Sequence, residues 1–306
     1  MAVKVRIGIG GVPVAGPEPE VGPGLAELVD QLERYRIDSI WLSDLVSSRQ
    51  TDPLIGLAYA AGRTERLKLG TGVLVLPGRN PSMVAAQLAG LAALAPGRVL
   101  PAFGVRPALA ADRSMFPVPD GERAAVFEEA LIVVRALLTE PTVTHHGHYF
   151  QLDGASVAPL PVKPLDLWLG GRAPVAMRRI GRLADGWLGS FVSPEEAANC
   201  RTLIERAAAE AGRQVEEDHY GTNIQVAPDG YSEAELAGTL ARVRTQRPEL
   251  PDPERLVCRG WAAARAELGR FIDAGLSKFV VRPAVPVTSR QDFLDQFSSE
   301  LLPLQN

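Results

Sequence analysis

The chain has 306 residues, of which 46% are hydrophobic and 22% are charged, and its formal net charge is −4. This composition is typical of a globular protein with a large core, and the length suits one α/β barrel of about 250 residues with insertions. The mild acidity and the scattered basic residues exclude an electrostatic case for binding nucleic acid or an anionic membrane.

The amino-terminal segment and the cysteines indicate the compartment. Met1–Gly11 has no basic segment followed by a long apolar core, so we interpret it as a first strand and not as a signal peptide. Cys200 and Cys258 are too few for a disulfide scaffold in a chain of this size. No apolar run approaches the ~18 residues that span a bilayer. We therefore expect a cytoplasmic protein.

Short apolar runs alternate with longer amphipathic stretches along the whole chain. Several runs are apolar without alternation, such as 69–76, which is typical of parallel strands buried on both faces. Eight runs are predicted strands: Val5–Gly11, Asp38–Ser43, Lys68–Leu76, Arg98–Gly104, Leu165–Gly171, Asp185–Gly189, Gly221–Val226 and Lys278–Arg282.

The stretches between these runs carry helix signals. Asp52 and Asn80 each place a capping side chain before a proline at the first helical position. Ser193 and Glu196 have the spacing of a capping box. Eight strands that alternate with helices close most simply into one (β/α)8 TIM barrel over residues 1–306. An open doubly wound sheet is the weaker alternative, because no Gly-x-Gly-x-x-Gly fingerprint follows the first strand.

Two regions break this alternation. Residues 105–164, after the fourth strand, are predicted to be an insertion that contains a helix at 122–139 and a strand-like section at Val143–Leu152. Residues from about 227 to 256, after the seventh strand, are rich in Pro, Asp and Glu and are predicted to be irregular. Loops that follow barrel strands lie at the catalytic face, so both regions are candidates for function.

The strongest local signal is a strand that ends in Gly170 and Gly171 and is followed at once by Arg172, Ala173 and Pro174. Glycines let a backbone approach a ligand closely, and the free amides at a helix start favour an anion. A guanidinium binds phosphate with two parallel hydrogen bonds. A tight turn with a surface arginine is an equally good interpretation.

Other candidates lie within or at the ends of predicted strands. Gly70 and Gly72 mark either a close approach to a ligand or a narrow barrel interior that needs small residues. Asp44 ends the second strand, where it would serve function or cap the next turn. Arg106 follows the fourth strand and Arg282 ends the eighth, and together they predict an anionic ligand at this face.

The histidines do not predict a metal site. His145, His146 and His148 are close in sequence, but neighbouring residues of a strand point to opposite faces, and no carboxylate or cysteine stands at ligand spacing beside them. His219 is isolated and is interpreted as structural. A metal-dependent hydrolase on the same barrel is therefore only a third option.

Taken in order, these fragments resemble the luciferase-like monooxygenase family, in its actinobacterial branch of coenzyme F-420-dependent oxidoreductases. Each fragment is weak alone, but the ordered set is specific for the family. The fragments are Asp38–Asp44, Leu69–Pro77 with Asn80 and Pro81, Gly97–Gly104, Glu122–Glu129, Gly147–Phe150, Pro159–Pro161, Trp168–Gly171 and Leu183–Trp187.

The resemblance implies a deazaflavin, coenzyme F-420, across the carboxyl ends of the strands, with FMN as the alternative. It implies a non-proline cis peptide between Gly72 and Val73, and a substrate beside Asp44, Leu45 and Arg282, with Asp44 as the candidate catalytic residue. The implied cofactor contacts are Gly72, Val73, Gly104, Val105, Arg106, Gly170, Gly171, Arg172, Ala173 and Pro174.

The chain departs from the family pattern at Leu45, where several deazaflavin members have a histidine. It also lacks the glutamate of the sugar-phosphate dehydrogenases, so we do not expect glucose-6-phosphate oxidation. We expect hydride transfer between the deazaflavin and a small organic substrate, for example reduction of an activated C=C or C=N bond. An FMN-dependent monooxygenase and a non-catalytic flavin-binding relative remain alternatives. Family members commonly dimerise through helices near the second and third strands, which implies a homodimer.

Overall fold

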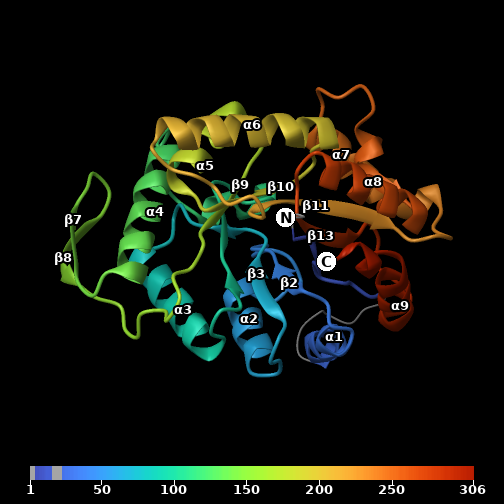
Figure 1. Cartoon of the computed structure of the whole chain (residues 1–306), viewed down its shortest axis with the longest axis horizontal. Helices are drawn as coiled ribbons and strands as arrows, with labels where there is room; N and C mark the ends of the chain where they lie inside the picture. Colours follow the sequence, from blue (N-terminus) through green and yellow to red (C-terminus); the bar gives the residue numbers. More distant parts are fainter. Residues whose placement is uncertain (1–3, 16–22) are drawn as a thin grey trace.

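The computed structural model describes residues 4–15 and 23–306, so the first three residues of the predicted amino-terminal strand region lie outside it. Within this part of the chain, eight parallel segments match the eight predicted strands in order (Figure 1). They are β1 (Arg6–Ile9), β2 (Ser39–Leu42), β3 with β4 (Lys68–Thr71 and Leu74–Val75), β5 with β6 (Val99–Leu100 and Ala102–Gly104), β9 (Trp168–Gly170), β10 (Gly186–Gly189), β11 (Tyr220–Ala227) and β13 (Lys278–Pro283).

The two ends of the sheet meet, so the sheet closes. Its order starts with β4–β6 and ends with β3–β5, and these are consecutive sections of the same two chain segments. Leu69 pairs with Val99 in the lower section and Leu74 pairs with Phe103 in the upper one. The first and last strands, β1 and β13, pair in parallel. The fold is therefore a parallel α/β sheet of the TIM-barrel type, as the alternation of apolar runs predicted.

Helices surround the strands in Figure 1. The predicted caps are confirmed: Asp52 accepts the N–H groups of Leu54 and Ile55, and Ser193 forms a capping box with Glu196. Asn80 caps its helix in the same way as Asp52. The helices that follow the barrel segments are α1 (Pro23–Arg34), α2 (Pro53–Ala61), α3 (Pro81–Leu94), α4 (Arg123–Thr139), α5 (Pro174–Leu183), α6 (Pro194–Glu210), α8 (Trp261–Asp273) and α9 (Arg290–Glu300), with the short η3 (Leu302–Leu304) after them.

The region after the seventh strand corrects a prediction. Residues 227–256 are not irregular throughout, because they contain α7 (Glu233–Gln246) and the short η2 (Pro253–Leu256). Ser232 starts α7 with a capping box. The helix buries only a narrow apolar stripe within a charged sequence, so its periodicity is weak. A further strand, β12 (Val257–Arg259), pairs with the end of β11.

The region after the fourth strand contains the predicted helix and hairpin. It holds the short η1 (Ala110–Met115), then α4, then the antiparallel strands β7 (Val143–His146) and β8 (Gln151–Ala155). The hairpin projects beyond α4, away from the barrel (Figure 1). Glu129 of α4 anchors it by accepting the backbone N–H groups of residues 148–150. The hairpin therefore lies apart from the ends of the barrel strands.

Two indole rings fill the middle of the barrel. Trp41 and Trp168 are buried together with small and aliphatic side chains of the other strands. A Cβ on Gly70 would lie 2.4 Å from Trp41, and a Cβ on Gly186 would lie 2.4 Å from Trp168. Glycine in these two strands thus makes room for the indoles, and at Gly70 this supports the interpretation of a narrow interior.

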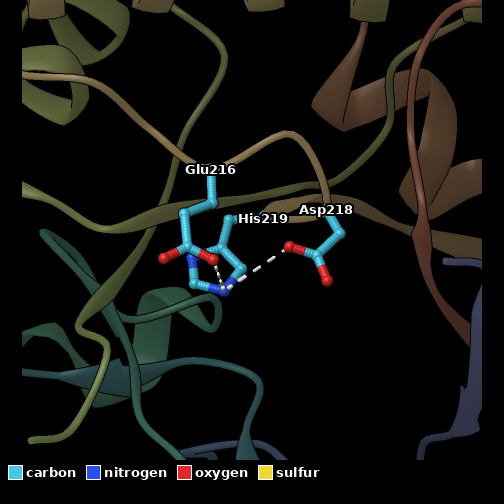
Figure 2. Close-up of side chains that lie close together, drawn as sticks. All are labelled: Glu216, Asp218 and His219. Atoms are coloured by element: carbon cyan, nitrogen blue, oxygen red, sulfur yellow. Dashed lines mark ion pairs between the residues drawn. The ribbon is translucent and has the colours of Figure 1, made fainter. Parts of the chain in front are cut away.

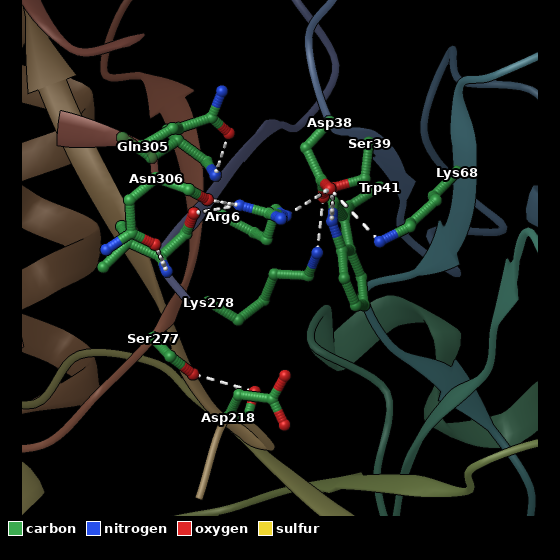
Figure 3. A network of polar contacts seen from close by, with 12 residues as sticks. Arg6, Asp38, Ser39, Trp41, Lys68, Asp218, Ser277, Lys278, Gln305 and Asn306 are labelled. Carbon is green, nitrogen blue, oxygen red and sulfur yellow. Dashed lines mark hydrogen bonds and ion pairs between the residues drawn. The ribbon is translucent and has the colours of Figure 1, made fainter. Parts of the chain in front are cut away.

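The amino ends of the strands are closed by a buried ionic network. Lys278 of β13 and Lys68 of β3 both reach the carboxylate of Asp38, and Arg6 approaches it at 3.8 Å (Figure 3). Burial by itself would raise the pKa of Asp38, but the two ammonium groups outweigh it and hold this pKa below its usual value. The buried cations at this end therefore have a counter-ion supplied by the chain.

The structure also bears on the compartment and membrane expectations. Cys200 and Cys258 are buried free thiols, so they form no disulfide with each other. Among the helices of residues 4–15 and 23–306, none combines the length and the apolar character needed to cross a bilayer.

Candidate functional site

The carboxyl end of the third strand segment is interrupted between β3 and β4. The Gly72–Val73 peptide bond is cis, at the position that the resemblance implied. The Gly72 carbonyl accepts the Ser43 hydroxyl at 2.8 Å and Nη2 of Arg282 at 3.2 Å, and its N–H donates to Leu42 at 2.7 Å. Side chains from the second and eighth strand segments therefore converge on this one backbone unit.

Asp44 holds the backbone that follows the break between β3 and β4. Its side chain is 2% exposed and accepts Nη2 of Arg79 at 2.9 Å and the N–H of Val75 at 3.0 Å. Its own N–H donates to the carbonyl of Val73 at 3.1 Å. The structure thus makes Asp44 the buried counter-ion of Arg79 and a brace for the backbone at 73–75. Arg79 was not among the residues that the sequence predicted.

Val73 lies in a cradle of two glycines. A Cβ on Gly104 would approach Cγ2 of Val73 to 2.6 Å, and a Cβ on Gly170 would approach its Cγ1 to 3.2 Å. The structure therefore brings together three of the predicted cofactor contacts, from three neighbouring strand segments. A Cβ at Gly104 would force Val73 to move, whereas a Cβ at Gly170 would require a shift of only a few tenths of an ångström.

The segment after β9 leads directly into α5. Gly171 has φ of +138°, and its carbonyl accepts Nε1 of Trp187 at 2.8 Å. Ala173 is the N-cap of α5 and Pro174 its first residue, and no side chain caps this end. The first N–H groups of a helix have no partner within the helix, so this end attracts anions. Arg172 is half-buried, and its Nη2 donates to the Gln246 carbonyl at 2.5 Å.

Helix α7 spans the carboxyl ends of the strands. Thr239 donates to the carbonyl of Ala284, just after β13, while the end of the helix meets Arg172. Next to it, Arg247 contacts Glu196 and the carbonyl of Phe191, beyond β10. The region that the sequence left irregular therefore supplies the cover of this face.

Arg282 lies across the mouth of the barrel, which is the opening formed by the carboxyl ends of the strand segments. Its Nε donates to Oδ1 of Asn223 at 2.8 Å, and a Cβ on Gly10 would lie 2.5 Å from its Nη1. Burial and, to a smaller extent, the positive charge of Arg242 together lower the pKa of Arg282 to about 10. Asn223 was missed from the sequence, although the amides at positions 223 and 225, which share one face of a largely apolar strand, were a signal that this face meets something polar.

The remaining predicted residues lie at the rim. Leu45 and Val105 are half-buried, and Arg106 is exposed. Arg106 lies near Arg123, whose pKa is lowered by burial and then by the Arg106 charge. The two strand-end arginines that predicted an anionic ligand are therefore in different surroundings: Arg106 faces solvent, whereas Arg282 is held in the mouth.

The loop after β2, which contains Leu45, is tied to η1. Asp112 of η1 is fully buried, and its Oδ1 accepts the Ser47 N–H at 2.9 Å. This contact between two loops at the mouth was not predicted from the sequence.

One histidine cluster lies at the opposite end of the strands. His219, which directly precedes β11, donates from Nδ1 to the Asp185 carbonyl at 2.8 Å. Its Nε2 lies 3.8 Å from Glu216 and 3.9 Å from Asp218, and these ligand atoms are close enough together to hold a cation (Figure 2). The Glu216 side chain is 77% exposed, and exposed carboxylates commonly group in this way without an ion. We assign no metal to it.

The hairpin histidines have carboxylate partners that sequence spacing did not reveal. Nε2 of His145 lies 3.2 Å from Glu129, the residue that anchors the hairpin, and His146 lies 3.4 Å from the exposed Asp153. These are pairwise contacts within and beside the hairpin, away from the mouth.

Comparisons with known proteins identify the family. The model of the family described as luciferase-like monooxygenase matches residues 7–282. An F-420-dependent glucose-6-phosphate dehydrogenase of Kineococcus radiotolerans is 28% identical over 319 residues, which cover 93% of this chain and 94% of the relative. The chain belongs to the luciferase-like monooxygenase family, and the expected oxidoreductase class, with relatives in the F-420-dependent branch, is confirmed.

Solved structures support the same fold. An F-420-dependent secondary alcohol dehydrogenase, solved with an F-420–acetone adduct, has a TM-score of 0.82 at 21% identity and covers 99% of this chain and 100% of its own. A monooxygenase from Streptomyces bottropensis has a TM-score of 0.79 at 22% identity, covering 98% and 99%. At these identities the likeness establishes the fold alone.

Proposed function

We propose that this protein is a coenzyme F-420-dependent oxidoreductase that transfers a hydride between the deazaflavin and a small organic substrate. The observation that carries the proposal is the cradle of Val73, Gly104 and Gly170 at the carboxyl ends of the strands, next to the uncapped start of α5. The F-420 dependence of the Kineococcus relative and of the alcohol dehydrogenase supports the choice of cofactor.

The residues present suit a flat ring attached to an anionic chain. Val73 and the two glycines would hold the ring by apolar contact, without polar groups that need partners. The backbone amides at Ala173 and the Arg172 guanidinium would hold the negatively charged part. When bound, the deazaflavin supplies the hydride acceptor or donor. Helix α7 would exclude water from the covered face.

The predicted substrate-binding residues Asp44 and Leu45 offer no general acid or base, which favours a substrate that needs no proton transfer from the protein. Leu45 neither donates nor accepts a proton, and Asp44 is committed to Arg79 and the Val75 amide. A reduced C=C or C=N bond can take its proton from water, whereas dehydrogenation of an alcohol needs a base beside the hydroxyl. We therefore propose reduction of an activated double bond, and we expect no oxidation of glucose 6-phosphate.

The test is a parallel titration of the protein with coenzyme F-420 and with FMN, followed by quenching of tryptophan fluorescence. We expect F-420 to bind more tightly than FMN. Gly104→Ala should weaken F-420 at least about tenfold, since its Cβ displaces Val73. Gly269→Ala on α8 is the matched control, because a Cβ there meets nothing within 4 Å. Tight FMN binding, with rapid oxidation of the reduced protein by oxygen, would favour the monooxygenase alternative instead. If neither F-420 nor FMN binds, the result would contradict the proposed function and favour a non-catalytic relative.

We further propose that two copies of the chain associate through α2 and α3. Neither helix contains a charged residue, and the two are neighbours in the fold. Their outer faces expose Ile55 (67%), Met83 (60%) and Leu94 (64%). An uncharged apolar face on adjacent helices is typical of a two-fold, self-complementary interface.

Sedimentation of the double variant Met83→Asp with Leu94→Asp tests this association. The natural chain should sediment at twice its mass of 32.8 kDa, and the variant as a monomer, because like charges would face each other across the two-fold axis. Ile132→Asp, on α4 and 47% exposed, places the same charge outside the face and should leave the dimer intact. A monomeric natural chain would contradict the proposal.

A further inference from the structure

Arg282 is a half-buried cation that lacks a counter-ion within the described part of the chain. The hydrogen bonds it makes go to Asn223 and to the Gly72 carbonyl, which are both neutral. Within residues 4–15 and 23–306, no carboxylate forms an ion pair with it. Charges that are withdrawn from water in proteins are normally paired, and Arg282 is half-buried with neutral partners, so its environment can accept an anion.

Strand β13 carries two cations, of which one has a carboxylate partner and the other has none within the described residues. Lys278 and Arg282 are an even number of residues apart on β13, so both point into the barrel. At the closed end, Lys278 has Asp38 against it. At the open end, the charged group that acts on Arg282 is a second cation, Arg242. The chain therefore supplies a carboxylate for the cation at the amino ends of the strands, and no ion pair is found for Arg282 at their carboxyl ends within the described residues.

A second polar group beside Arg282 is also unsatisfied. Gln225 is the residue of β11 in register with Arg282, and its Oε1 is buried without a hydrogen-bond partner. Asn223, two residues earlier on the same face, is fully engaged with Arg282, Gly189 and Ser190. The mouth thus contains a guanidinium, that of Arg282, and a side-chain amide, that of Gln225, which could both bind a polar ligand.

The cover helix brings the second cation into position. Arg242 lies between Thr239 and Gln246 on α7, at helical spacing from both. Thr239 contacts the carbonyl just beyond β13, and the Gln246 carbonyl meets Arg172. Arg242 is therefore on the face of α7 that is turned to the strand ends, where partial burial of its guanidinium lowers its pKa.

We propose that the substrate of this protein carries an oxyanion, a carboxylate or a phosphate, that is held by Arg282 and Arg242 with Gln225 beside it. This inference rests on the proposed function and names its substrate class. The subsite is distinct from the cofactor's own anionic part, which we place at Arg172 and α5. Arg282 comes from β13, on the other side of the sheet order from β6 and β9.

The experiment is calorimetric titration with inorganic phosphate and, separately, with acetate, which distinguishes the two oxyanions. The natural protein should bind at least one of them, and the binding should persist when coenzyme F-420 is saturating. Arg282→Gln should weaken it at least about tenfold and Arg242→Gln about threefold, since a charge-assisted hydrogen bond is lost in each. Arg206→Gln, an exposed arginine on α6, is the matched control and should bind as the natural chain does.

The outcomes separate this inference from the proposed function, because F-420 affinity is measured on the same samples. F-420 binding without any anion binding would overturn the oxyanion subsite and leave the cofactor assignment standing. If the protein binds an anion, Arg282→Gln abolishes this binding and no deazaflavin binds, the oxyanion subsite would stand and the cofactor assignment would be overturned. Displacement of phosphate by F-420 would assign Arg282 to the cofactor and overturn the inference. Should Arg282→Gln fail to fold, unchanged affinity in Arg242→Gln would be the contrary result.

Discussion

Replacing Asp38 by asparagine is expected to lower the free energy of unfolding by about 3–5 kcal/mol. The side chains of Asp38 and Lys278 are each 7% exposed, so the variant leaves a buried ammonium group without its counter-ion. Urea unfolding followed by tryptophan fluorescence measures the change. Asp30→Asn removes a surface partner of Arg63 and should cost about 1 kcal/mol or less. Equal effects of the two substitutions would contradict the role given to the buried network.

The same residue gives a pH dependence. The pKa of Asp38 is lower in the folded chain than its usual value of 3.8, since the ammonium groups outweigh the effect of burial. Its contribution to stability is therefore complete above about pH 4 and is lost as the pH falls through the folded pKa. Asp38→Asn should lack this part of the acid dependence. An unfolding free energy that falls equally in both proteins below pH 4 would count against it.

Removing Arg79 is expected to have the second large effect. Arg79→Gln leaves the Asp44 carboxylate, 2% exposed, without its cation, and should cost about 3 kcal/mol of unfolding free energy. Because Asp44 also holds the Val75 amide, the backbone under Val73 should loosen and F-420 affinity should fall about tenfold. Unfolding in urea and the quenching titration measure the two losses separately.

The double variant provides the control for this pair. Asp44→Asn in the Arg79→Gln background replaces a buried charge by a neutral amide, so part of the lost stability should return. Arg63→Gln, at a surface pair, should change neither stability by more than about 1 kcal/mol nor F-420 affinity. Additive losses in the double variant would show that the two side chains do not act on each other.

The strands were predictable because their signal is local. A run such as 69–76 must be apolar throughout when both faces are buried, and caps such as Asp52 act on amides two or three residues away. Helix α7 was not predictable in this way. It touches the barrel through Leu236, Leu240 and Val243, which is too narrow a stripe to stand out among its charged residues.

The candidate site was predicted in its positions and not in its contacts. Glycines and strand-end charges drew attention to Gly72, Gly170 and Arg282, which the structure places at or near the carboxyl ends of the strands; their roles stay predictions. The partners of these groups come from distant segments: Arg79 lies 35 residues from Asp44, and Arg282 lies 210 residues from Gly72. Such pairings follow from the closure of the sheet, so the interpretation of Asp44 as a turn cap or a catalytic group could not be decided beforehand.

The pairing of β1 with β13 also fixes when the protein can become functional during its synthesis. Arg6 finds its neighbour Lys278 only after some 270 further residues have been made (a sequence separation of about this size makes folding slow). Until β13 leaves the ribosome, β1 has an open edge, and Arg282 is not yet there to complete the mouth. Partly made chains should therefore bind no cofactor and should depend on chaperones to shield that edge.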